Sequence, residues 1–101
     1  MFARVARYDV EEERMDAAAE AFREAASQLA SLTGFQGGYV MTAREDGVIM
    51  SMTLWESRSA MENSEVRAAR LRQDATRNVD GKVTSVQCFE VAVDIGNPPG
   101  D

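Results

Sequence analysis

Two apolar runs joined by a short turn stand at the centre of this chain, where residues 35–55 read FQGGYVMTAREDGVIMSMTLW. The turn is residues 45–47, Glu-Asp-Gly, and Asp-Gly pairs tolerate the positive φ values that hairpin turns require. One face of residues 48–55 is wholly apolar and consists of Val48, Met50, Met52 and Leu54. The opposite face is half polar, so neither face is typical of a strand surface in full contact with water. We therefore expect a β-hairpin of strands 35–43 and 48–55.

A long helical pattern precedes the hairpin. Asp9 stands three residues before Glu12, as in a capping box, and acidic residues follow where the helix dipole favours them. Apolar residues then recur at spacings of three and four, and Thr33-Gly34 is a stop signal. The sequence predicts a helix over residues 11–32, preceded by a strand over residues 2–8.

A second helical pattern follows the hairpin. Ser57 is the expected N-cap, and Asn63-Ser64 predicts a kink with a second cap at Ser64 before the helix continues over residues 65–79. Asp80-Gly81 ends it, and residues 83–94 are expected to form a long last strand.

The resulting order is β-α-β-β-α-β, which is typical of ferredoxin-like α+β domains with a four-stranded antiparallel sheet and both helices on one face. We expect residues 1–95 to form this single domain and residues 96–101 to be a flexible C-terminal tail. Two helices cover one sheet face, yet the strands carry apolar residues on both. An uncovered apolar face usually marks an interface, so we predict that two chains pack sheet to sheet as a homodimer.

Composition excludes several classes of function. The 101 residues carry a formal net charge of −6, which disfavours nucleic acid and anionic membranes as partners. There is no histidine and only one cysteine, Cys88, so the chain cannot supply an imidazole base for a nucleophilic triad or the ligand set of a zinc site. We expect no metal and no cofactor. The first ten residues include Arg4, Arg7 and Asp9, so we expect neither a signal peptide nor a spanning helix there, and a cytoplasmic location.

Three local stretches carry a family resemblance: Gly34-Phe35-Gln36-Gly37-Gly38-Tyr39, the Asp46-Gly47 turn, and Leu54-Trp55-Glu56-Ser57. Over residues 1 to about 94, the chain resembles the antibiotic biosynthesis monooxygenase-like (ABM) superfamily, whose members are dimeric α+β barrels of two ferredoxin-like protomers. The resemblance implies a cofactor-independent monooxygenase acting on an aromatic or polyketide-like small molecule. The same fold also carries haem-degrading monooxygenases, isomerases and decarboxylases.

The haem-degrading branch has an Asn on the first strand, a Trp in the Trp-Glu-Ser stretch and a His in the second helix. Here only Trp55 matches, because Ala6, Arg7 and Tyr8 stand where the Asn would fall and Arg70-Leu71 where the His would be. The histidine of that branch binds the haem iron. Any enzyme activity is therefore expected to be of the ABM oxygenase type and not haem degradation.

Cofactor-free oxygenation requires an acidic substrate whose anion gives an electron to dioxygen in a dry pocket. From their positions in the sequence, we assign Trp55, Asn63 and Arg67 as candidate catalytic residues and Tyr39, Trp55 and Met61 as candidate substrate-binding residues. Only Trp55 rests on a motif match. Each also has a structural reading: Trp55 and Met61 as core, Tyr39 at a barrel rim, Asn63 as a helix break and Arg67 on a solvated helix face.

Two other classes of function stay open at this point. One is a non-catalytic module of the same fold that binds a small apolar ligand or acts only in assembly. The other is an isomerase or lyase, which needs a buried carboxylate such as Glu56 or Glu90. Cys88 is expected to be a small buried hydrophobic residue with no nucleophilic role. The sequence identifies neither a substrate nor a pathway.

Overall fold

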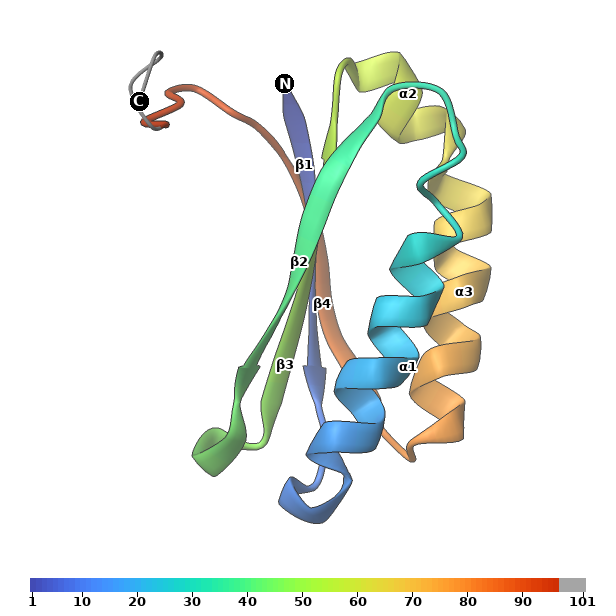
Figure 1. Ribbon diagram of the computed structural model, residues 1–101, viewed down its shortest axis with the longest axis vertical. Coiled ribbons are helices and arrows are strands. Elements are labelled where there is room, and N and C mark those ends of the chain that lie inside the picture. Colours follow the sequence, from blue (N-terminus) through green and yellow to red (C-terminus); the bar gives the residue numbers. More distant parts are fainter. Residues whose placement is uncertain (97–101) are drawn as a thin grey trace.

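A computed structural model describes residues 1–96, and it contains one sheet with helices on one side (Figure 1). All strand pairs are antiparallel, in the order β2-β3-β1-β4. The strands are β1 (Phe2–Asp9), β2 (Phe35–Ala43), β3 (Val48–Trp55) and β4 (Lys82–Glu90). The helices are α1 (Met15–Ser27), α2 (Arg58–Asn63) and α3 (Glu65–Asn78), with short 3-10 turns η1 (Glu12–Arg14) and η2 (Arg44–Asp46). The expected ferredoxin-like β-α-β-β-α-β arrangement is confirmed.

The central hairpin forms with the bounds expected from the sequence. Strands β2 and β3 pair from Phe35 opposite Trp55 to Ala43 opposite Val48. Gly47 closes the turn with φ of 67°, the left-handed conformation that a residue with a Cβ rarely adopts. The Asp-Gly signal therefore located this hairpin correctly.

The first helix is shorter than its pattern indicated. Residues 12–14 form the 3-10 turn η1 without a side-chain cap, so the capping box expected from Asp9 does not form, and Asp9 instead ends β1. Helix α1 ends at Ser27, and turns carry the chain to Gly34, which has φ of 84°. The chain reverses direction here to enter β2, and the apolar residues after Ser27 pack within this turn and do not extend the helix.

The break in the second helical region is confirmed. The hydroxyl of Ser57 accepts a hydrogen bond from the amide of Ala60 and caps α2, as predicted. Ser64, however, does not cap α3 through its side chain. Its hydroxyl donates to the carbonyl of Met61 over 2.6 Å, which leaves its oxygen free to accept from elsewhere.

The last strand ends earlier than expected, at Glu90, although the amide of Val91 still donates to the carbonyl of Met1 over 2.9 Å. The pairing of β1 with β4 shifts between Arg7 and Tyr8, so Thr84 is an extra residue on β4. This irregularity turns Val83 to the same face as Tyr8, so the side chains of β4 do not alternate regularly along the whole strand. The tail expected at residues 96–101 lies, apart from Gly96, outside the described residues.

The sheet has two chemically different faces. The helix-covered face carries β1 side chains paired with those of β3: Phe2 with Trp55, Arg4 with Thr53, Ala6 with Ser51, and Tyr8 with Ile49. The open face carries Ala3, Val5, Met50, Met52 and Leu54, together with Tyr39, Met41 and Phe89 from the edge strands. The wholly apolar face of β3 is therefore the open one, and its half-polar face points toward the helices.

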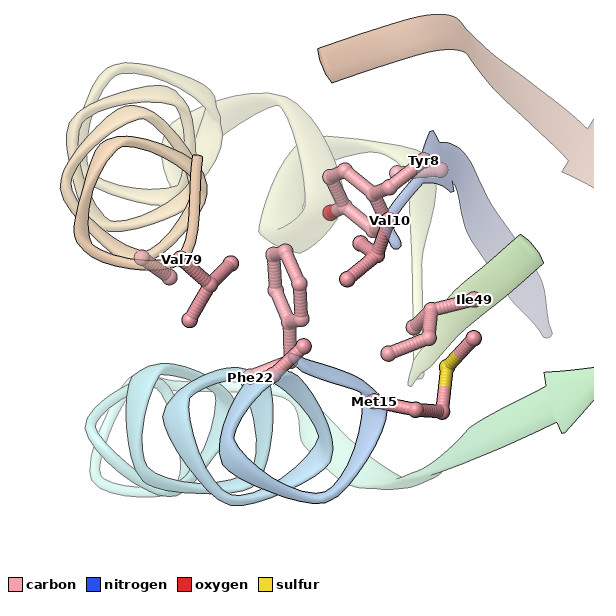
Figure 2. Packing of buried hydrophobic residues seen from close by; sticks show 9 residues of the cluster. Tyr8, Val10, Met15, Phe22, Ile49 and Val79 are labelled. Carbon is pink, nitrogen blue, oxygen red and sulfur yellow. The ribbon is translucent and has the colours of Figure 1, made fainter. Parts of the chain in front are cut away.

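Two apolar clusters hold the helices on the sheet. The first surrounds Phe22 of α1, whose ring stacks on Tyr8 with 4.1 Å between centroids (Figure 2). The second joins Trp55, Leu29, Met61 and Ala68 beneath α2 and the start of α3. Between these clusters the helix-covered face is polar. No helix within residues 1–96 is long and apolar enough to cross a bilayer.

Candidate functional site

A small cavity lies between the middle of the sheet and the two long helices. It has a volume of about 40 Å³, which is room for roughly two or three water molecules. Its sheet wall combines polar side chains, and its helix wall is apolar apart from Arg72. The lining residues are Arg4, Ala6, Tyr8, Ser51 and Thr53 from the sheet, and Phe22, Ala25, Ala26, Leu29, Ala68, Leu71 and Arg72 from the helices.

Arg4 is the most unusual residue in this wall, because only 4% of its surface is exposed. Its Nη2 donates to the carbonyl of Met61 over 2.7 Å and to the hydroxyl of Ser64 over 3.0 Å, and lies 2.9 Å from Glu65. Its Nε and Nη1 are buried without a hydrogen-bond acceptor within residues 1–96. Since Nε carries one N–H bond and Nη1 two, three of the five guanidinium N–H bonds have no protein partner there.

A second guanidinium makes the cavity positively charged. Arg72 of α3 lines the same space with a side chain only 13% exposed, and its Nη2 lies 3.7 Å from Glu65. Glu65 stands outside the lining and is 46% exposed, so its charge is partly screened by water. Two cations with one half-exposed carboxylate give this cavity a net positive charge, although the whole chain carries −6.

One pair of hydroxyl groups and one indole–hydroxyl pair complete the polar wall. The hydroxyl groups of Tyr8 and Ser51 lie 3.0 Å apart, and because one proton serves that bond, the other is free for a ligand. Burial raises the pKa of Tyr8 above its usual value, while the hydrogen bond to Ser51 and the charges of Arg72 and Arg4 act against this rise. The indole N–H of Trp55 donates to the hydroxyl of Thr53 over 2.9 Å, and the Arg4 guanidinium lies 5.8 Å from the indole ring.

This arrangement offers hydrogen-bond donors in a low-dielectric space, and donors of this kind stabilise a negatively charged ligand. No carboxylate is among the lining residues, so the wall is suited to holding an anion more than to removing a proton. Across residues 1–96 there is no cluster of three or more His, Cys, Asp or Glu side chains that could bind a metal.

The structure divides the residues predicted from the sequence into three places. Trp55 and Met61 are buried together in the cluster beneath α2, next to Arg4. Asn63 and Arg67 share an exposed surface hollow. Tyr39 is 63% exposed and borders a groove of about 500 Å³ between α1 and β2. The roles assigned to these residues stay predictions, and only Trp55 and Met61 adjoin the cavity wall.

Sequence reasoning missed Arg4, Arg72, Tyr8, Ser51 and Thr53. The signal was present for the β1 residues, because a period of two places Arg4 and Tyr8 on the same face as Phe2 and Ala6.

The expectation for Cys88 was wrong, since it is exposed on the edge strand β4 and does not contribute to the core. Within residues 1–96, strand β4 pairs only with β1, so its other edge has no neighbouring strand there. Glu56 and Glu90, the two carboxylates considered for an isomerase or lyase, are both exposed.

Comparison with known proteins agrees with the observed fold. A family model described as antibiotic biosynthesis monooxygenase matches residues 1–70. No curated protein matches the chain at a comparable level of significance.

Several solved structures share the fold at low sequence identity. A candidate antibiotic biosynthesis monooxygenase from Deinococcus radiodurans is 13% identical, with a TM-score of 0.76 over 97% of this chain and 99% of that one. SnoaB, a cofactor-independent oxygenase from Streptomyces nogalater, is 17% identical, with a TM-score of 0.71 over 95% and 97% of the two chains. A third structure, from Nitrosomonas europaea, is 12% identical, with a TM-score of 0.68 over 92% and 100%. At these identities the likeness shows a shared fold.

Proposed function

The chain belongs to the antibiotic biosynthesis monooxygenase family, and on this basis we propose that it is a cofactor-independent oxygenase acting on an aromatic or polyketide-like small molecule. The observation that supports this most is the buried, positively charged cavity beneath the helices. Its donors come from the chain's own side chains, and an activated substrate anion is what such a reaction has to stabilise. The similarity in fold to SnoaB is consistent with this proposal.

The proposed reaction uses the substrate as its own source of electrons. An acidic CH₂ or phenolic group loses a proton to water, since no carboxylate lines the cavity, and the cationic wall favours the ionised form because nearby positive charge lowers the pKa of an acid. For a CH₂ centre, the carbanion adds dioxygen and the resulting peroxide takes up a proton. Loss of water then leaves a carbonyl. One oxygen atom ends on carbon and the other in water, and the substrate supplies all four electrons.

Substrate entry requires the helices to move. The cavity volume of about 40 Å³ is far below the roughly 300 Å³ of an ordinary ligand pocket. The wall on the helix side consists largely of small or flexible side chains from α1 and α3, including Ala25, Ala68, Leu29 and Leu71. We propose that α1 and α3 separate along this seam, and that Trp55 and Met61 below it contact the substrate.

Oxygen consumption tests the activity directly. Metal-free protein is mixed with a panel of anthrones and naphthoquinols, and protein-dependent uptake is measured with an oxygen electrode. With ¹⁸O₂ we expect one labelled oxygen in the product. Trp55→Phe and Arg4→Met are run alongside, with Arg77→Met as a control on the exposed side of α3. No protein-dependent uptake, together with ligand-induced quenching of Trp55 fluorescence, would favour a non-catalytic small-molecule-binding module instead.

We also propose that the chain is a homodimer in which a second copy covers the open face. Strands about 4.8 Å apart and eight residues long give four strands an area of about 20 Å by 27 Å, or about 500 Å² per copy. Two copies bury about 1,000 Å², which reaches the lower bound of a specific interface. Tyr39, Met41 and Phe89 are 63%, 41% and 46% exposed on this face, and an apolar surface of this size is unfavourable in water.

Light scattering after size-exclusion chromatography tests the dimer. We expect twice the 11.1 kDa protomer mass at micromolar concentration. A mass of one protomer under these conditions contradicts the proposal.

A further inference from the structure

We propose that the cavity beneath the helices is a carboxylate-binding site, in which Arg4, assisted by Arg72, selects ligands that carry an ionised carboxyl group. This inference rests on the proposed function, since it adds a substrate class to the same cavity. It goes further because a permanent negative charge on the substrate is not required for oxygenation.

The first argument is the state of the Arg4 guanidinium. Leaving a buried N–H donor without an acceptor destabilises a fold, and a charged group is penalised more than a neutral one. Here Nε and Nη1 are both buried without an acceptor within residues 1–96, while Nη2 makes contacts to Met61, Ser64 and Glu65 that hold the side chain in place. A guanidinium that is fixed on one nitrogen and unpaired on the other two is pre-organised for an additional acceptor.

The second argument is the number of donors. Arg4, which has three N–H bonds unpaired within residues 1–96, lines the cavity together with Arg72 and with the Tyr8–Ser51 pair, which has one free hydroxyl proton. A carboxylate has two oxygens and about four acceptor positions, and guanidinium groups match its planar shape. A single phenolate or enolate oxygen accepts fewer bonds and would leave several of these donors unpaired. The donor set therefore fits a carboxylate better.

The third argument is the position of Glu65. Its two oxygens lie 2.9 Å from Arg4 Nη2 and 3.7 Å from Arg72 Nη2, so it bridges the two cations from the solvent side. This carboxylate competes electrostatically with an incoming anion. Removing its charge should therefore strengthen anion binding, whereas a purely structural ion pair gives no such gain.

Binding of matched acids and amides tests the proposal. The probes are benzoate and 1-naphthoate, each compared with its neutral amide of nearly the same shape, by titration calorimetry and by the fluorescence of Trp55, the single tryptophan. The wild-type protein should prefer each acid over its amide by at least about tenfold, the size expected for a charge-assisted contact. Arg4→Met should abolish this preference and leave amide binding unchanged. Glu65→Gln should tighten acid binding several-fold, and Arg77→Met, which removes an exposed charge from the same helix, should change neither.

Three results overturn the inference. They are equal affinity for acid and amide in the wild-type protein, a preference that survives Arg4→Met, and no binding of either acid at about 10 mM. Binding does not depend on oxygen uptake, so the two proposals fail separately. Acid-selective binding without oxygen consumption supports the site and contradicts the oxygenase, whereas oxygen consumption with no preference for acids contradicts the site alone.

Discussion

Arg4→Met should leave the stability of the folded protein close to that of the wild type, although Arg4 is almost fully buried. Two effects of the substitution oppose each other. Each of the two buried nitrogens without an acceptor destabilises the folded state by about 1–3 kcal/mol, so removing both stabilises it by about 2–6 kcal/mol in total. Losing the contacts of Nη2 with Met61 and Ser64 costs about 1.5–3 kcal/mol each, and the half-exposed pair with Glu65 adds at most about 1 kcal/mol.

The partners of Arg4 do not become unpaired in this variant. The carbonyl of Met61 still accepts from the hydroxyl and the amide of Ser64, and Glu65 keeps water and Arg72 as neighbours. The midpoints of the two ranges, about 4 kcal/mol gained and about 5 kcal/mol lost, nearly cancel, so the net change in unfolding free energy is expected to lie within about 2 kcal/mol of zero. Arg4→Ala, which also deletes buried stem methylenes, should be less stable than Arg4→Met by about 2–3 kcal/mol.

Urea denaturation monitored by circular dichroism measures these differences, and equal protein concentrations keep any contribution of dimerisation constant. Breaking a buried structural ion pair typically costs more than about 3 kcal/mol. If the free energy of unfolding of Arg4→Met falls by more than this, Arg4 stabilises the fold and the reasoning from its unpaired nitrogens is wrong. Near-neutral stability combined with lost acid binding indicates a residue kept for its ligand.

Three further predictions concern other parts of the molecule. Burial raises the pKa of Tyr8, so above about pH 10 the unfolded chain loses this proton before the folded one does. The free energy of unfolding should therefore fall by up to about 1.4 kcal/mol per pH unit in that range. Denaturation curves should show this fall for the wild type and for Tyr39→Phe, but not for Tyr8→Phe. Gly34→Ala should lower the free energy of unfolding by about 2–4 kcal/mol, because φ is 84° and the new Cβ falls 2.5 Å from that of Ala60. In a double-mutant cycle, Ala60→Gly should recover part of this loss. Simple additivity of the two substitutions would contradict the clash. Met52→Lys places a charge on the open face and should yield protomers in light scattering, whereas an unchanged mass argues against the sheet-to-sheet dimer.

The fold was largely predictable because its strongest signals are local. The Asp-Gly turn and the alternating run after it determine the central hairpin, and the Ser57 cap determines where α2 begins. The errors came where tertiary packing competes with local pattern. Helix α1 ends at Ser27 although its apolar spacing continues, and β4 gains one residue at Thr84, which reverses the faces of part of the strand.

The candidate site was less predictable, and β1 shows why. Arg4 and Arg7 are the same residue type on one strand, but they lie three positions apart and so on opposite faces. Arg7 is exposed, whereas Arg4 points beneath the helices. A basic residue on a strand is ordinarily assigned to the solvent side. Phe2 and Tyr8 share the face of Arg4, but Ala3 and Val5 make the face of Arg7 apolar as well, so this signal alone did not decide which of the two cations is buried.

The arrangement of polarity across the sheet links the two proposals. An antiparallel sheet with helices on one side normally buries its apolar face beneath them and presents polar side chains to water. Strand β3 departs from this pattern: Ser51 and Thr53 lie between Ile49 and Trp55 on the face toward the helices, while Met50, Met52 and Leu54 lie on the open face. Ser51 and Thr53 are hydrogen-bonded there, but Arg4 beside them keeps two buried nitrogens without an acceptor within residues 1–96, and stability alone does not account for these. The proposed ligand under the helices accounts for the unpaired donors of Arg4, and the proposed second copy accounts for the apolar side chains on the open face.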